Sequence, residues 1–175
     1  MAIVISINRA PVLTLWAAVV AERLGFDWAE AMTLARAVAG LNAYSKGVHL
    51  GLFQPTPDAE RERRKAAEAG ATLRIALLGR AVPAVQTPEG VRALSKHRPI
   101  EPESVERYLR GKFGESFDEA KQAMERLASG LPPHDLALHA YHLYEQFRPT
   151  IPAGARGWGA QGQLDLDAIA NLVGA

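Results

Sequence analysis

A long apolar run near the N-terminus, residues 11–21, constrains most strongly what this chain can fold into. The run begins with Pro11, which suits the first turn of a helix because its ring fixes a helical φ and its missing N–H would have no partner there. A helix that spans a bilayer needs about 20 apolar residues. This run is shorter and ends at a charged pair, so we expect a core helix over residues 11–24 that Gly25 terminates, and no membrane partner.

A second helix is expected directly after this one, over residues 28–42. Asp27 and Glu30 have the three-residue spacing of a capping box, in which each side chain accepts a hydrogen bond from the backbone N–H of the other residue. A glycine between two helices lets them cross closely, as in the helix-turn-helix that places its second helix in the major groove of DNA. The sequence therefore predicts a helical hairpin that resembles a helix-turn-helix.

The composition of the second helix favours a structural role over the reading of bases. Only Glu30, Thr33 and Arg36 among residues 28–41 carry side chains that can hydrogen-bond to bases. Direct readout of the major groove uses Arg, Lys, Asn and Gln side chains, and a helix that is apolar all round is usually buried. A plain helical hairpin is therefore the favoured interpretation, and a DNA-reading hairpin is the alternative.

Short β-branched segments predict strands outside the helical hairpin. Residues 3–7 are consistent with one strand, and residues 72–79 and 81–86 with a β-hairpin turning at the intervening glycine and arginine. Pro83 has no N–H to donate to a neighbouring strand, so we expect the second strand of this hairpin to lie at an edge. The N-terminal strand is a candidate for a third strand of the same sheet.

The remainder of the chain is predicted to be helical. Helices are expected over residues 103–112, 117–129 and 133–147, with a short one starting near Asp165. We therefore predict an α+β fold, mainly helical, with an N-terminal helical hairpin, a central β-hairpin and a C-terminal three-helix segment with a glycine-rich tail. Residues 1–100 and 101–175 would form two lobes of one compact unit.

The charge of the chain is balanced overall but uneven along the sequence. The formal net charge is +1, which provides no overall field to attract DNA or an anionic membrane. Residues 53–100, however, carry nine basic and five acidic side chains, whereas residues 101–175 carry seven and eleven. The chain has no cysteine, which excludes disulfides, thiolate nucleophiles and cysteine-ligated metals, and which fits a cytoplasmic protein.

The basic central region leads to the preferred functional hypothesis, a non-enzymatic DNA-binding or transcription-regulating protein. A hairpin tip that carries Arg80 resembles the wing of a winged helix in its architecture. Acidic residues are interleaved with the basic ones, so an ordinary solvated surface is the alternative interpretation of this region, and the one that its composition favours. The predicted nucleic-acid contacts are Arg36, Lys46, Arg63, Arg64, Arg80 and Arg156.

A histidine-rich helix suggests a different class, a small metal-dependent enzyme. Asp135, His139 and His142 fall on one stripe of the helix over residues 133–147, because residues three and four apart are neighbours. Imidazole and carboxylate groups are ligands of Zn²⁺ or Fe²⁺. A single helix rarely supplies a complete site, however, and no second histidine-rich segment exists. These residues are therefore weak candidates, and no metal, cofactor or catalytic residue is predicted.

The glycine-rich segment over residues 154–162 contains the pattern G-x-G-x-x-G. The dinucleotide fingerprint needs a strand before it, a long helix after it and an acidic residue about 20 positions further on. Prolines precede this segment and the given sequence stops soon after it, so the fingerprint is not met. Trp158 could instead contact a ligand or anchor a partner. A protein-interaction or homo-oligomerisation module is thus the second functional alternative.

Overall fold

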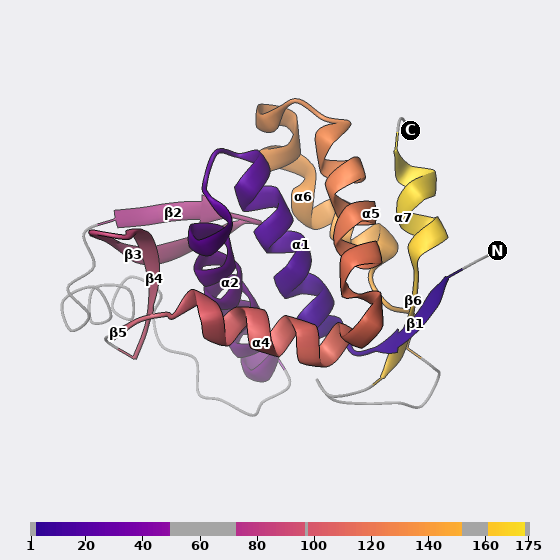
Figure 1. Cartoon of the computed structure of the whole chain (residues 1–175), viewed down its shortest axis with the longest axis horizontal. Helices are drawn as coiled ribbons and strands as arrows, with labels where there is room; N and C mark the ends of the chain where they lie inside the picture. Colours follow the sequence, from indigo (N-terminus) through magenta and orange to yellow (C-terminus); the bar gives the residue numbers. More distant parts are fainter. Residues whose placement is uncertain (1–2, 50–72, 97, 152–160, 174–175) are drawn as a thin grey trace.

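The computed structural model describes residues 3–49, 73–96, 98–151 and 161–173, with residues 44–49 described as backbone only. Figure 1 shows a bundle of helices with a small antiparallel sheet at each end. The predicted α+β, mainly helical class is confirmed, as are the two N-terminal helices, the central hairpin and the C-terminal helices. Within the described residues, no helix combines the length and apolar character needed to cross a membrane.

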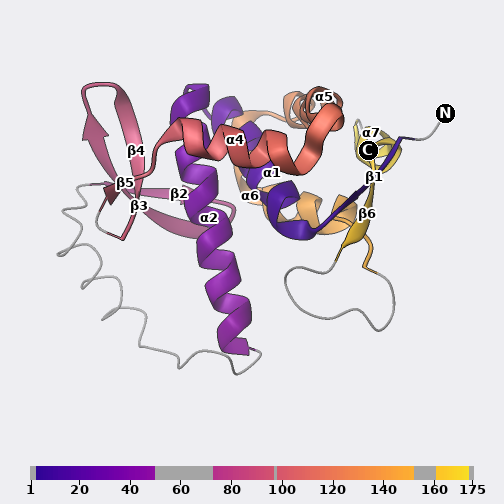
Figure 2. The same cartoon turned by 60° about the horizontal axis from the view of Figure 1, so that its bottom comes forward.

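The first helix is the centre of the bundle. Helix α1 (Arg9–Arg23) has every side chain buried from Pro11 to Ala21, because it packs against α2 and against three helices of the C-terminal half. Helix α2 (Trp28–His49) is longer than predicted, and its fully buried side chains, among those that the structure describes, lie between Ala31 and Val38. Figure 2 shows its C-terminal part projecting away from the other helices. Burial by neighbouring helices on all sides accounts for the apolar composition of α1.

The remaining helices agree in their bounds with the sequence pattern to within a residue or two. They bury apolar side chains three and four residues apart, the spacing of one helix face. These elements are α4 (Pro102–Phe113), the 3-10 turn η1 (Gly114–Ser116), α5 (Phe117–Ser129), α6 (Pro133–Phe147) and α7 (Leu166–Leu172). Helices α4, α5 and α6 pack around α1, and α7 packs on α5. The side chain of Asp165 caps α7 by accepting a hydrogen bond from the Asp167 N–H at 2.9 Å.

The central hairpin is part of a larger sheet than the sequence suggested. Four strands follow one another in the order in which they occur, and the last two had not been predicted. They are β2 (Leu73–Leu77), β3 (Arg80–Thr87), β4 (Gly90–Ser95) and β5 (Arg98–Pro99). The sheet packs against α2, mainly through β4.

The expectation that Pro83 places its strand at an edge is wrong, because β3 lies between β2 and β4. The register explains why a proline is tolerated there. Strand β2 pairs with residues 80–84 and β4 with residues 84–87, so only Ala84 has a partner on both sides. Pro83 is paired with Arg74 of β2 alone, and its missing N–H therefore interrupts no ladder on the other side.

The N-terminal strand does not join this sheet, as the sequence had suggested it could. Strand β1 (Val4–Ile7) pairs antiparallel with β6 (Gly162–Asp165) at the opposite end of the molecule, as Figures 1 and 2 both show. The reason is positional: β1 leads directly into α1, so it can reach only strands near the start of that helix. The four-stranded sheet lies instead against α2.

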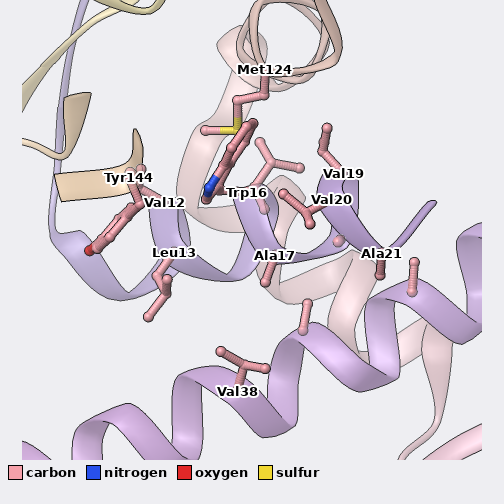
Figure 3. Packing of buried hydrophobic residues seen from close by; sticks show 14 of the residues in the cluster. Val12, Leu13, Trp16, Ala17, Val19, Val20, Ala21, Val38, Met124 and Tyr144 are labelled. Atoms are coloured by element: carbon pink, nitrogen blue, oxygen red, sulfur yellow. The ribbon is translucent and has the colours of Figure 1, made fainter. Parts of the chain in front are cut away.

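Trp16 ties the central helix to the C-terminal helices. Its side chain is 0% exposed, and its ring stands edge-on to Phe147 with the ring centroids 5.3 Å apart. The indole N–H donates a 2.8 Å hydrogen bond to the carbonyl oxygen of Ala140 on α6, which satisfies the one polar group that would otherwise be buried without a partner. Figure 3 shows the ring beside Met124 of α5.

Candidate functional site

The turn between α1 and α2 has the predicted capping box. The Glu30 N–H donates to Asp27 Oδ1 at 2.8 Å, and the Asp27 N–H donates to Glu30 Oε1 at 3.0 Å. The second carboxylate oxygen of Glu30 accepts a 2.7 Å hydrogen bond from the Val91 N–H of β4. Glu30 therefore starts α2 and fastens the four-stranded sheet to it at the same time.

Thr33 makes a second link between α2 and β4 one turn further on. Its hydroxyl donates to the Glu30 carbonyl at 2.9 Å and accepts from the Ala93 N–H at 3.1 Å, and its side chain is fully buried. The Trp28 ring is half-buried, with the Lys121 ammonium of α5 4.5 Å from its centroid. The first half of α2 is therefore occupied by contacts within the protein, where a helix-turn-helix would present it to DNA.

Of the three side chains within residues 28–41 that can hydrogen-bond to bases, Arg36 alone is exposed. It lies beside Tyr108 of α4: burial raises the pKa of the Tyr108 hydroxyl, and the positive charge of Arg36 opposes that shift. Arg80 approaches α2 elsewhere, donating from Nη2 to Asn42 Oδ1 at 3.3 Å. Arg36 and Asn42 are six positions apart, about 120° around a helix. The two predicted arginines therefore lie on different flanks of α2.

The other predicted contacts cannot be placed. Arg63, Arg64, Arg156 and Trp158 lie outside the described residues. Lys46 belongs to the last turns of α2, where the structure describes only the backbone. Whether these four cations share a surface with Arg36 or with Arg80 therefore stays untested.

The basic excess of the central region belongs to the sheet. Residues 73–100 carry five basic side chains and a single acidic one, whereas residues 53–72 carry four of each. Arg74 and Arg92 share one face of the sheet, because each is on the same face as its β3 partner, Pro83 or Val85. That face is opposite to the one whose alanines and valines are buried against α2. Counting charges separately for residues 53–72 and 73–100 would have revealed this from the sequence.

The histidine stripe on α6 is at the surface. Asp135, His139 and His142 are all exposed, and His142 Nε2 is 2.8 Å from the side-chain amide nitrogen of Gln146. In the part of the chain that the structure describes, no group of three or more His, Cys, Asp or Glu side chains is placed to hold a metal ion. These residues therefore receive no support from the fold as a metal centre.

Comparison of the chain with protein-family models, with curated proteins and with solved structures gives no match in any of the three. The function is therefore argued from charge and geometry alone.

Proposed function

We propose that this is a cytoplasmic, non-enzymatic protein that binds nucleic acid, acting as a DNA-binding or regulatory protein. The observation that carries the proposal is the excess of basic over acidic side chains in the four-stranded sheet. Phosphate contacts from lysine and arginine supply most of the affinity of sequence-independent binding. The sheet, with the projecting half of α2 beside it, is the surface on which we expect the backbone of the nucleic acid to lie.

Three features of the sheet support this choice. Arg80 joins the β2–β3 hairpin to Asn42 in the second half of α2, which makes the helix and the hairpin one connected unit. Lys96 and Arg98 are exposed at the turn between β4 and β5. The register places Arg92 on the face of the sheet turned away from α2, and its Nη1 donates a 2.9 Å hydrogen bond to the Val91 carbonyl oxygen. The proposal thus uses the sheet for phosphates and does not require the buried first half of α2 to enter a groove.

The test is a titration of random duplex DNA, followed by fluorescence anisotropy at several salt concentrations. Arg92→Gln and Arg98→Gln should each weaken binding, and each should lower the slope of log affinity against log salt by about 1. Arg126→Gln is the matched control, because Arg126 is an exposed arginine on α5, away from the sheet. Failure of the wild type to bind below a Kd of about 100 μM at low salt, the weak limit of non-specific binding, would remove the proposal.

Self-association is a second candidate, favoured by the apolar surface of β1. Ile3 and Val4 are 41% and 53% exposed, and among the described residues β1 has a partner strand on one side only. An unpaired strand edge with apolar side chains is a template for pairing with a second copy. Val4→Lys should then abolish a concentration-dependent rise in mass in sedimentation, whereas Leu138→Lys, at a 67% exposed site on α6, should not.

A further inference from the structure

Two arginines from distant parts of the sequence meet where α1 begins and α6 ends. Arg9 is in the first turn of α1, and its Nε donates a 3.0 Å hydrogen bond to the carbonyl oxygen of Pro149. Arg148, the residue before Pro149, follows the last turn of α6 and is half-buried. The Tyr144 hydroxyl donates to the Arg9 carbonyl oxygen at 3.4 Å, which attaches α6 to the first turn of α1.

Among the residues that the structure describes, no carboxylate forms an ion pair with Arg9 or Arg148, and the first turn of α1 has no acidic residue. Burial lowers the pKa of Arg9, and the positive charge of Arg148 lowers it further. Two like charges held close together in a partly buried setting oppose folding unless an anion lies between them.

The fold fixes the two arginines in place. Thr150 and Gln163 exchange backbone hydrogen bonds of 3.1 and 3.0 Å, which attach the segment after Arg148 to β6. The next residue pair along β6, Gly162 and Ile7, attaches it to β1, which leads into Arg9. A Cβ on Gly162 would lie 2.8 Å from Pro149 Cβ and 2.9 Å from the Thr150 carbonyl oxygen, so glycine permits this close approach.

We propose that Arg9 and Arg148 together bind a phosphate group. A guanidinium presents a planar fork of donors that matches phosphate oxygens, and two of them offset the charge of about −1.5 to −2 that a phosphate monoester carries at neutral pH. The Nε of Arg9 donates to the Pro149 carbonyl oxygen. This hydrogen bond orients the guanidinium and leaves its Nη groups for the ligand. The half-buried Tyr141 lies next to Tyr144, with the two ring centroids 5.7 Å apart, and is near enough to Arg9 to interact with it electrostatically.

Arg148→Gln is the decisive variant, because the Arg148 side chain makes no hydrogen bond to the described part of the protein whose loss would itself cost stability. Inorganic phosphate is titrated by calorimetry at constant ionic strength, and thermal unfolding is recorded with and without phosphate. We expect the variant to bind phosphate at least about tenfold more weakly, as for the loss of a charge-assisted hydrogen-bond pair. In phosphate-free buffer its Tm should equal or exceed that of the wild type, since a repulsion has been removed.

Two further variants complete the test. Arg148→Lys keeps the charge but not the fork, so its affinity for phosphate should fall between those of Arg148→Gln and the wild type. Arg126→Gln, the exposed arginine on α5, should bind phosphate as the wild type does. Equal phosphate binding by the wild type and Arg148→Gln, or no binding by the wild type at millimolar phosphate, would overturn the proposal. So would a lower Tm of Arg148→Gln in phosphate-free buffer, which would show a purely structural role.

The source of the phosphate is decided by repeating the comparison with a short DNA duplex. If Arg148→Gln weakens both phosphate and duplex binding, the site takes a phosphodiester of the nucleic-acid backbone. If it weakens phosphate binding alone, the site takes a small phosphate-bearing ligand. The site is independent of the proposed function, because phosphate binding can hold when the protein binds no DNA at all.

Discussion

The two ends of the α1–α2 hairpin differ in how their charges are satisfied. At the turn end, the Glu30 carboxylate accepts hydrogen bonds from two backbone N–H groups, and Thr33 both donates and accepts. At the open end, where α1 begins, Arg9 and Arg148 lie together without a carboxylate partner among the described residues. Figure 3 shows the two helices side by side, with Val38 of α2 facing the first half of α1.

This difference separates structural charge from charge that is available to a ligand. Polar groups that satisfy one another, as at the turn end, stabilise the fold and present little to a partner. Where the fold holds like charges together, an anion that binds between them stabilises the folded protein, because it binds the native state and not the unfolded one. The comparison therefore directs functional tests to the open end and to the basic sheet, and directs stability tests to the turn end.

Trp16 lies between the two ends, and its removal should have the largest effect of all. Trp16→Ala deletes a fully buried ring and leaves the Ala140 carbonyl without its donor. We expect a loss of about 3–5 kcal/mol in the free energy of unfolding, as for other buried aromatic residues. Urea denaturation followed by circular dichroism measures this change. A loss below about 1 kcal/mol would mean that α1 is not packed as the structure shows.

Glu30→Ala tests the turn end. The substitution removes the acceptor for the Asp27 and Val91 N–H groups, so we expect a loss of about 1–3 kcal/mol in the free energy of unfolding. Glu22→Ala is the control on α1, since Glu22 makes no side-chain hydrogen bond to the described residues, and it should change stability by about 0.5 kcal/mol or less. Equal losses for the two variants would contradict a special role for Glu30.

Tyr144→Phe tests the buried hydroxyl beneath the open end through its pH dependence. Burial raises the pKa of Tyr144 above its ordinary value of about 10, so the hydroxyl ionises first in the unfolded chain as the pH rises. The unfolded state then binds fewer protons than the folded state, and stability falls above about pH 10 by up to about 1.4 kcal/mol per pH unit. Urea denaturation at a series of alkaline pH values should show a smaller fall for the phenylalanine variant. An unchanged slope would show that Tyr144 is accessible.

Arg148→Gln should have the smallest effect on stability and so sharpens the contrast with Glu30→Ala. We expect no loss, and a gain of at most about 0.5 kcal/mol, in phosphate-free buffer, because a repulsion is removed and no hydrogen bond to the described residues is lost. Urea denaturation of both variants under the same conditions gives the comparison directly. A destabilisation as large as that of Glu30→Ala would mean that the two ends do not differ in the way proposed.

Local sequence rules predicted the helices well and the partners of the strands poorly. The bounds of α5 and α6 and the capping box of Asp27 and Glu30 were all predicted, because helix periodicity and capping depend on residues a few positions apart. The edge position expected from Pro83 was wrong, because the rule counts neighbouring strands without knowing where each pairing begins and ends.

The candidate site was less predictable than the fold. The excess of basic residues in the central region could be counted from the sequence, but the contact of Arg80 with Asn42 could not. Arg9 and Arg148 carry no motif and are 139 positions apart, so no sequence pattern joins them. Their proximity follows from the pairing of β1 with β6, which is a long-range contact.

The sequence by itself determined the apolar centre of the chain, the capped start of α2 and the absence of cysteine chemistry. These depend on composition and on interactions within one or two helical turns. Only the tertiary structure decided that the sheet covers the first half of α2 and that two arginines meet at the start of α1. The physical reason is that such contacts depend on how whole elements pack against one another. Patterns of a few neighbouring residues do not specify that packing.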